Sequence, residues 1–155
     1  MPVQRRSWTV QRVGWIVMAL VVIAALLGLF SSGPLSSTTA QGAAGSVRIE
    51  YDRFERFLTP SRLRVVFPAA ADANGTVSLR FSRSYLESIQ IEQIQPEPRQ
   101  SLTAADGVVF VFSSAAADGP GMAFFAIKPQ EIGLVQGRIG LAGQPPVRFT
   151  QFVYP

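Results

Sequence analysis

The sequence predicts an all-β protein, an antiparallel β-sandwich, preceded by one N-terminal transmembrane helix. Residues 13–30 are uniformly apolar, residues 31–46 are small and uncharged, and from residue 47 onward apolar side chains recur at every second position between turn signals. The pattern thus changes from one that suits a membrane-embedded helix to one that suits half-buried strands. We divide the 155 residues into a cytoplasmic basic N-terminus (1–12), a transmembrane helix (13–30), a flexible linker (31–46) and an extracytoplasmic β-sandwich domain (47–155).

The predicted span contains no charged or strongly polar side chain between residues 13 and 30. A helix of this length measures about 27 Å, close to the ~30 Å hydrocarbon core of a bilayer. A buried helix of a small soluble protein would keep a polar stripe, which this segment lacks. We therefore expect the lipid bilayer to contact residues 13–30.

Charge on the two sides of the span predicts its orientation. Three arginines precede it, and no charge of either sign follows it until Arg48. Such an asymmetry holds the amino terminus in the cytoplasm. We therefore predict a protein of the cell (inner or plasma) membrane whose C-terminal domain is extracytoplasmic. Tryptophan is favoured at headgroup depth, as is a basic residue on the cytoplasmic side. The predicted membrane-interface anchors are Arg5, Arg6, Trp8, Arg12 and Trp15.

A cleaved signal peptide is the competing interpretation, because small residues at 38–40 offer a cleavage site after Ala40. A signal peptide has an apolar region of about 7–15 residues that its cleavage site follows closely. Here the apolar run is longer, and Ala40 lies ten residues beyond its end. We therefore predict that the anchor is retained.

Eight short strands follow, separated by glycine, proline, asparagine and aspartate. The run at 108–112 is apolar on both sides and predicts an interior strand, as does the run that ends the chain. One helical turn is expected at 84–87. The predicted strands are 47–51, 63–67, 77–81, 89–94, 108–112, 122–127, 137–141 and 147–153.

The number and length of these strands resemble an immunoglobulin-like sandwich over residues 47–155. The resemblance is one of architecture, since the paired cysteines and the strand tryptophan of that fold are absent. A jelly-roll arrangement of the same strands remains open.

Composition excludes several classes of function. From Arg48 onward the chain has eleven basic and ten acidic residues, so the exported part is nearly neutral and nucleic-acid binding is not expected. Histidine and cysteine are absent, which excludes Ser-His-Asp and Cys-His catalysis and the usual zinc ligands. The only lysine, Lys128, has no serine motif beside it. We predict a protein that is not an enzyme and that needs no cofactor or metal.

Three carboxylates gather early in the domain, at Glu50, Asp52 and Glu55, with arginines between them. We predict solvent-exposed ion pairs here rather than a metal or acid–base site. A second acidic motif, at residues 72–75, opens like a calcium loop but lacks the closing glutamate, so we predict a hairpin turn.

Aromatic residues recur at every third position in residues 51–57. No single strand can bury all of these rings on one face. Either the strand bends or bulges and all three reach the core, or one ring stays exposed among arginines, a combination enriched at the energetic centres of protein interfaces. The predicted partner-binding residues are Tyr51, Arg53, Phe54 and Arg56.

The favoured function is therefore protein binding by an anchored, exported domain, as an accessory or scaffolding subunit of a membrane or envelope assembly. The alternative is an envelope module that binds polysaccharide or peptide, and a hydrolase of unknown type ranks third. Sugar binding needs an exposed aromatic platform, whereas most phenylalanines here occupy strand positions that a core would claim. This argument lowers the rank of the polysaccharide alternative.

Overall fold

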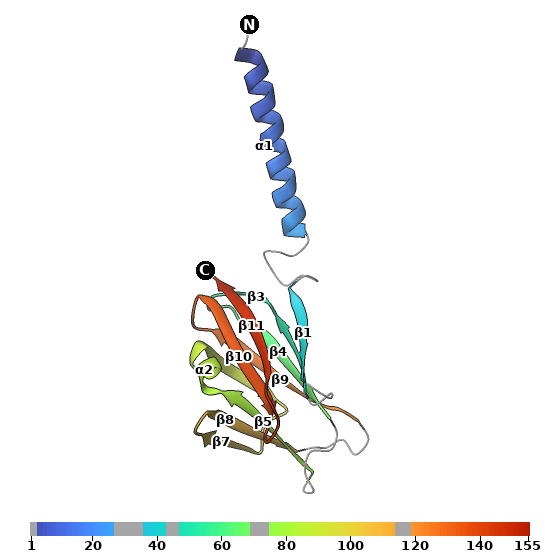
Figure 1. Cartoon of the computed structure of the whole chain (residues 1–155), viewed down its shortest axis with the longest axis vertical. Helices are drawn as coiled ribbons and strands as arrows, with labels where there is room; N and C mark the ends of the chain where they lie inside the picture. Colours follow the sequence, from blue (N-terminus) through green and yellow to red (C-terminus); the bar gives the residue numbers. More distant parts are fainter. Residues whose placement is uncertain (1–2, 27–35, 43–46, 69–74, 114–118) are drawn as a thin grey trace. The chain divides into compact units, whose positions relative to one another are not determined.

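The computed structural model describes residues 3–26, 36–42, 47–68, 75–113 and 119–155. The chain forms two compact units, Met1–Ser36 and Ser37–Pro155 (Figure 1). Among the described residues, the first holds one long helix and the second holds the strands.

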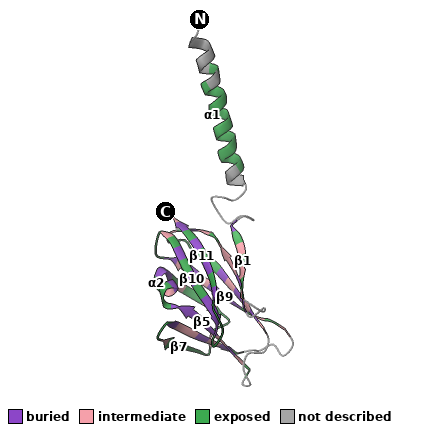
Figure 2. Cartoon of the chain, in the orientation of Figure 1, coloured by how far each residue is buried: buried purple, intermediate pink, exposed green. Residues whose placement is uncertain are grey.

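In the first unit, α1 spans Val3–Leu26, and Trp8 and residues 10–23 are exposed (Figure 2). Within the described ranges, no helix is both long and apolar enough to cross a membrane, so the transmembrane part of the predicted fold is not supported. The last four residues of the predicted span, 27–30, lie outside the described residues.

The second unit is a β-sandwich of two sheets. Every neighbouring pair of strands is antiparallel except β3 and β11. Sheet 1 has the order β1 (Ser37–Gln41), β2 (Arg48–Asp52), β4 (Ser61–Phe67), β9 (Gly121–Pro129), β6 (Ile89–Gln95). Sheet 2 has the order β3 (Phe54–Arg56), β11 (Val147–Tyr154), β10 (Gly133–Leu141), β5 (Thr76–Ser82), β8 (Gly107–Ser113), β7 (Gln100–Ala104). A short helix, α2 (Arg83–Ser88), follows β5.

The core lies between the sheets and takes alternate residues of the strands, visible as buried bands along them in Figure 2. Aromatic rings fill its centre. Phe125 of β9 lies 4.7 Å from Phe81 of β5 and 6.2 Å from Phe112 of β8, measured between ring centroids. Tilted and edge-on pairs at these distances are the favoured geometries of aromatic contacts, so sheets 1 and 2 interlock through them.

The predicted all-β sandwich is confirmed. Each of the eight predicted strands is present, as β2, β4, β5, β6, β8, β9, β10 and β11, and α2 lies at the predicted helical turn. The predicted interior positions of β8 and β11 are also confirmed, since each pairs with a strand on both sides. The hairpin predicted at 72–75 lies outside the described residues except for Gly75, whose φ of 65° suits a turn glycine.

The structure differs from the predicted boundary between linker and domain. Residues Ser37–Gln41, assigned to the linker, form β1 and pair with β2 along their whole length. Their composition is that of a linker, but an edge strand is held by main-chain hydrogen bonds to its neighbour and needs little apolar surface. Ala40 of β1 also packs against the core. The folded domain therefore begins at Ser37.

Candidate interaction surface and the polar cluster beneath it

The chain passes from one sheet to the other at Arg53. β2 ends at Asp52 in sheet 1, and β3 begins at Phe54 in sheet 2. The carbonyl of Arg53 accepts a hydrogen bond from the amide of Phe152 at 2.7 Å. This contact aligns β3 in parallel with the end of β11, at the edge of sheet 2.

The crossing separates the three predicted aromatic rings. Tyr51 and Phe57 are half-buried and pack against the core, with the Tyr51 ring 4.8 Å from that of Phe149. Phe54 is half-buried on β3. The bend that the sequence predicts is therefore present, and it carries two rings toward the core while the third lies in another sheet.

Phe54 belongs to a row of apolar side chains on the outer face of sheet 2. Its register partner on β11 is Phe152, whose own partner on β10 is Leu134. Phe152 is 43% exposed and Leu134 is 73% exposed. We call Phe54, Phe152 and Leu134 the apolar stripe. Partners in register on adjacent strands share a face and lie about 5 Å apart, so the three side chains form one continuous surface.

Arginines lie beyond the stripe on the same outer face. Arg138 of β10 and Arg148 of β11 are register partners and both are exposed. Neither has an ion-pair partner among the described residues. Phe152 is four positions after Arg148 on β11, which places the arginine pair about 13 Å along the strands from the stripe. The outer face thus combines an apolar end with a positive end.

The two predicted arginines have different positions. Arg53 donates a hydrogen bond to the side-chain oxygen of Thr38 on β1, at 3.1 Å, and so contacts sheet 1. Arg56 is exposed on β3 in register with Tyr154. Of the predicted partner-binding residues, Phe54 and Arg56 lie on the outer face of sheet 2, and Tyr51 and Arg53 do not. Phe152 and Leu134 were missed, although both fall at the outward positions of alternating strands.

A buried polar cluster lies beneath the stripe. Glu55, which alternates with Phe54 on β3, points inward and is only 4% exposed. Its Oε1 accepts hydrogen bonds from the Ser61 hydroxyl and, at 2.7 Å, from Nε2 of Gln151. The same Nε2 also donates to the carbonyl of Asp52 at 3.1 Å, and Oε1 of Gln151 accepts from the Tyr85 hydroxyl at 2.8 Å. The cluster ties β3 to β2, β4, β11 and α2.

Burial changes the acidity of these groups. The pKa of Glu55 is raised to about 7, chiefly because burial desolvates the carboxylate. The neighbouring charge of Asp52 also raises this pKa, whereas the hydrogen bonds from Ser61 and Gln151 lower it. Burial also raises the pKa of Asp52 and holds the pKa of Tyr85 well above its ordinary value. The Glu55 carboxyl is therefore a proton-binding group of the folded domain near neutral pH.

This geometry corrects the predicted group of exposed ion pairs. Glu50 does form one, with Arg64 of β4 at 3.1 Å. Glu55 does not, because the passage to sheet 2 turns its side chain into the interior. In the part of the chain that the structure describes, no three acidic side chains come together as a metal site would require.

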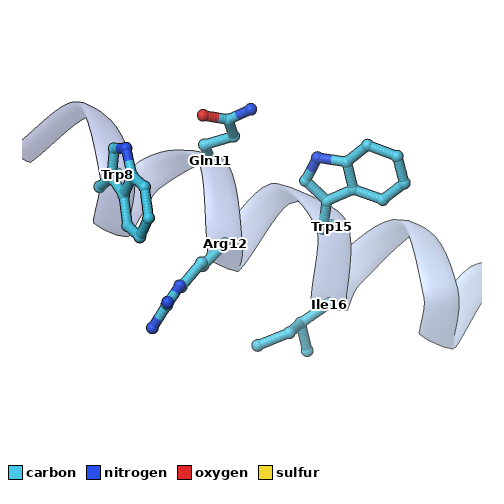
Figure 3. A pocket seen from close by; sticks show the side chains of 5 residues that line it. All are labelled: Trp8, Gln11, Arg12, Trp15 and Ile16. Atoms are coloured by element: carbon cyan, nitrogen blue, oxygen red, sulfur yellow. The ribbon is translucent and has the colours of Figure 1, made fainter.

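The predicted membrane-interface anchors lie on α1. Trp8, Arg12 and Trp15 lie with Gln11 and Ile16 around one hollow along the helix (Figure 3). The guanidinium carbon of Arg12 is 5.1 Å from the centroid of the Trp8 ring, a cation–π contact one helical turn apart. The side chains of Arg5 and Arg6 lie outside the described part of the chain.

Comparisons with known proteins add little to this geometry. No protein-family model matches the chain, and no curated protein matches it in sequence. Among solved structures it is similar to a cohesin module from a Clostridium perfringens ATCC13124 family 33 glycoside hydrolase. The two are 9% identical with a TM-score of 0.46, over 75% of this chain and 98% of that one. So distant a likeness does not indicate what this chain binds.

Proposed function

We propose that this chain is a single-span, membrane-anchored protein whose exported, immunoglobulin-like sandwich binds a partner protein through the outer face of sheet 2. Its role would be that of an accessory or scaffolding subunit of a membrane or envelope assembly. The observation that carries the proposal is the apolar stripe. Single exposed apolar residues are ordinary, but Phe54, Phe152 and Leu134 adjoin across three strands, and contiguous apolar patches mark interaction sites.

The charges of the same face indicate the chemistry of the partner. The exposed Arg138 and Arg148 side chains adjoin, and neither forms an ion pair with another described residue. Asp106 lines the same hollow as Arg138 but is paired with Arg80. Like charges opposite each other destabilise a sheet. A carboxylate on the partner would relieve this repulsion. The face therefore suits a protein that presents an apolar anchor and, about 13 Å away, an acidic group.

Membrane anchoring is supported by the sequence and by the position of β1. The apolar run at 13–30 has the length of a span, with arginines on one side only. Cleavage after Ala40 would remove four of the five residues of β1, which pairs with β2. Retention of the anchor keeps this strand intact.

The anchor is tested by a carboxy-terminal alkaline phosphatase fusion and by sequencing the mature amino terminus. The fusion should be active, since the enzyme folds only on the exported side. A mature protein that begins at Gln41 would contradict the anchor and leave the binding surface untouched.

The binding surface is tested by co-purification of the full chain from its native membranes after chemical cross-linking. The test variant carries Leu134→Ser with Phe152→Ser. The matched control is Leu102→Ser, because Leu102 is 53% exposed on the same sheet but on β7, at the opposite edge from β3. A stoichiometric partner should be retained by the wild type and the control and lost from the test variant, since truncated interface anchors cost about 2 kcal/mol or more. Equal retention by all three proteins would refute the assignment of this surface.

A further inference from the structure

The outer face of sheet 1 contains a hollow of about 360 Å³, separate from the surface on sheet 2. This volume falls within the range of small-ligand sites, which is about 300–1,000 Å³. The hollow lies across β4, β9 and β6, and its lining residues are Arg62, Gln93, Gln95, Phe124, Phe125 and Ala126.

A small residue between longer ones creates the hollow. Ala126 of β9 is in register with Arg62 of β4 on one side and with Gln93 of β6 on the other. Both of these side chains are exposed and extend past the alanine methyl group. Phe124, the next outward residue of β9, is 42% exposed and closes one end. The hollow therefore has a narrow apolar floor, two polar walls and an aromatic end.

An irregularity in β6 supplies one of the polar walls. The register of β6 with β9 shifts between Ile91 and Gln93. An unbroken alternation from Gln90 would point Ile94 outward and bury Gln93 and Gln95. The shift instead leaves both glutamines exposed and turns Ile94 toward the core. Bulges that re-aim side chains in this way are frequent beside functional sites.

The Phe124 ring is held in place from the side of β4. The guanidinium carbon of Arg64 lies 5.4 Å from the ring centroid, and Arg64 itself is fixed by its ion pair with Glu50 at 3.1 Å. Arg64 also contacts the sulfur of Met122 at 2.8 Å. The ring is thus positioned before any ligand arrives, at little further entropic cost.

The lining groups match a ligand that is rich in hydroxyl groups and carries a negative charge. Each glutamine amide offers both donors and an acceptor, as paired hydroxyl groups require. Arg62 has no hydrogen-bond or ion-pair partner among the described residues, and its guanidinium suits a carboxylate. No acidic side chain lines the hollow, which disfavours a cationic ligand.

A peptide fits these groups less well. The main chains of β4, β9 and β6 are already paired with one another along this stretch, so a peptide could not add to the sheet within the hollow. A sugar ring, in contrast, presents polarised C–H groups to an aromatic face and hydroxyl groups at its rim.

We propose that this hollow is a binding site for an acidic oligosaccharide, with Phe124 stacking on a sugar ring, Gln93 and Gln95 binding hydroxyl groups, and Arg62 binding a uronate carboxylate. The site extends the function of the domain beyond protein binding, and neither surface depends on the other.

The test measures binding by isothermal titration calorimetry on the full chain in a zwitterionic detergent, because detergents with sugar headgroups would compete. The probes are trigalacturonate, trimannuronate and a hyaluronate tetrasaccharide, each compared with its neutral methyl ester. The variants are Arg62→Ala and Phe124→Ala. The matched control is Arg48→Ala, because Arg48 is an exposed arginine of the same sheet that does not line the hollow.

At least one acidic probe should bind to the wild type and the control with saturation, about 10–100-fold more tightly than its ester. Arg62→Ala should remove that preference, and Phe124→Ala should weaken both forms about tenfold, with the thermal melts of both variants unchanged. Three results would each overturn the proposal: no saturable binding to any acidic probe at millimolar concentration, equal affinity for acid and ester, or binding that survives both substitutions. Selection of a displayed peptide that requires Phe124 and excludes the sugars would assign the hollow to peptides instead.

Discussion

Replacement of Glu55 by glutamine is expected to make the domain more stable at alkaline pH and to remove most of its pH dependence between pH 4.5 and 7. The amide oxygen of glutamine can accept the same hydrogen bonds from Ser61 and Gln151 that the carboxylate accepts. The substitution removes only the charge that the wild type must bury once Glu55 loses its proton.

The direction follows from the pKa of Glu55, which folding raises from 4.5 to about 7. Below pH 4.5 the carboxyl is protonated in both the folded and the unfolded chain, and the stabilisation is fully present. As pH rises toward 7 the unfolded chain loses this proton while the folded domain keeps it, so the free energy of unfolding falls. Above pH 7 the loss is complete. Burial raises the pKa of Asp52 as well, which acts in the same direction.

The size follows from the same shift. At about 1.4 kcal/mol per pKa unit, the wild type loses roughly 3–4 kcal/mol of stability between these limits. For a domain of about 120 residues, that corresponds to roughly 10 °C in melting temperature. The Glu55→Gln protein should therefore melt about 10 °C above the wild type at pH 8 and within a few degrees of it at pH 4.5.

Thermal melts followed by circular dichroism at half-unit pH steps measure this difference. The matched control is Glu97→Gln, because Glu97 is exposed and has no ion-pair partner among the described residues. This control should keep the pH dependence of the wild type. The reasoning fails if Glu55→Gln is no more stable than the wild type at pH 8, or if its melting temperature still falls by the full amount from pH 4.5 to pH 8.

Three further predictions concern the buried cluster, the last strand and the outer face of sheet 2. Tyr85→Phe should destabilise the domain by about 1–2 kcal/mol in urea denaturation, because Oε1 of the buried Gln151 loses its donor; an unchanged midpoint would mean that the cluster does not act as a unit. Deletion from Val147 should abolish cooperative melting, since β11 pairs with both β10 and β3; a truncated chain that melts like the full one would show that this strand is dispensable. Phe54→Ala with Arg56→Ala should weaken retention of the partner protein with a small change in melting temperature, measured by co-purification and circular dichroism; a large loss of stability with the partner still retained would place these side chains in the core instead.

Much of the fold could be predicted because apolar and polar residues alternate along a strand that has one face in the core and one face in solvent. β4 and β5 display this pattern almost without interruption, and each was placed to within two residues. β1 and β7 could not be predicted in this way. They are polar edge strands held by main-chain pairing with β2 and β8, and their side chains carry little record of that pairing.

The sites were harder to predict because they depend on which strand neighbours which. Phe124 lies in a run that is apolar on both faces, so the sequence does not show which of its side chains face solvent. In the fold, Phe124 lies on the outer face of sheet 1 and is 42% exposed. In the sequence, Glu55 is one of three carboxylates in what appears as a single solvent-exposed strand face. Its side chain points into the core only because the chain passes to sheet 2 at Arg53. Phe152 and Leu134 are 18 residues apart in sequence and meet through the pairing of β10 with β11. None of these relations is local in sequence.

β3 connects the buried cluster to the proposed interaction surface, because adjacent residues of this strand belong to each. Its three residues place Phe54 in the stripe and Glu55 in the cluster, so one strand carries both. A charge on Glu55 opposes burial of that strand, because the carboxylate is more stable in water. Above pH 7 the position of Phe54 should therefore be held less firmly, and the partner should bind more weakly than at pH 6.

The partner's affinity at the two pH values tests this connection directly. Once the partner is identified by co-purification, its dissociation constant should rise severalfold from pH 6 to pH 8 with the wild type and stay level with Glu55→Gln. A Leu134→Ser protein, which weakens the stripe without altering the cluster, should bind less well at both values and keep the pH dependence. The same pH dependence in the wild type and in Glu55→Gln would separate the two sites and place the titrating group on the partner.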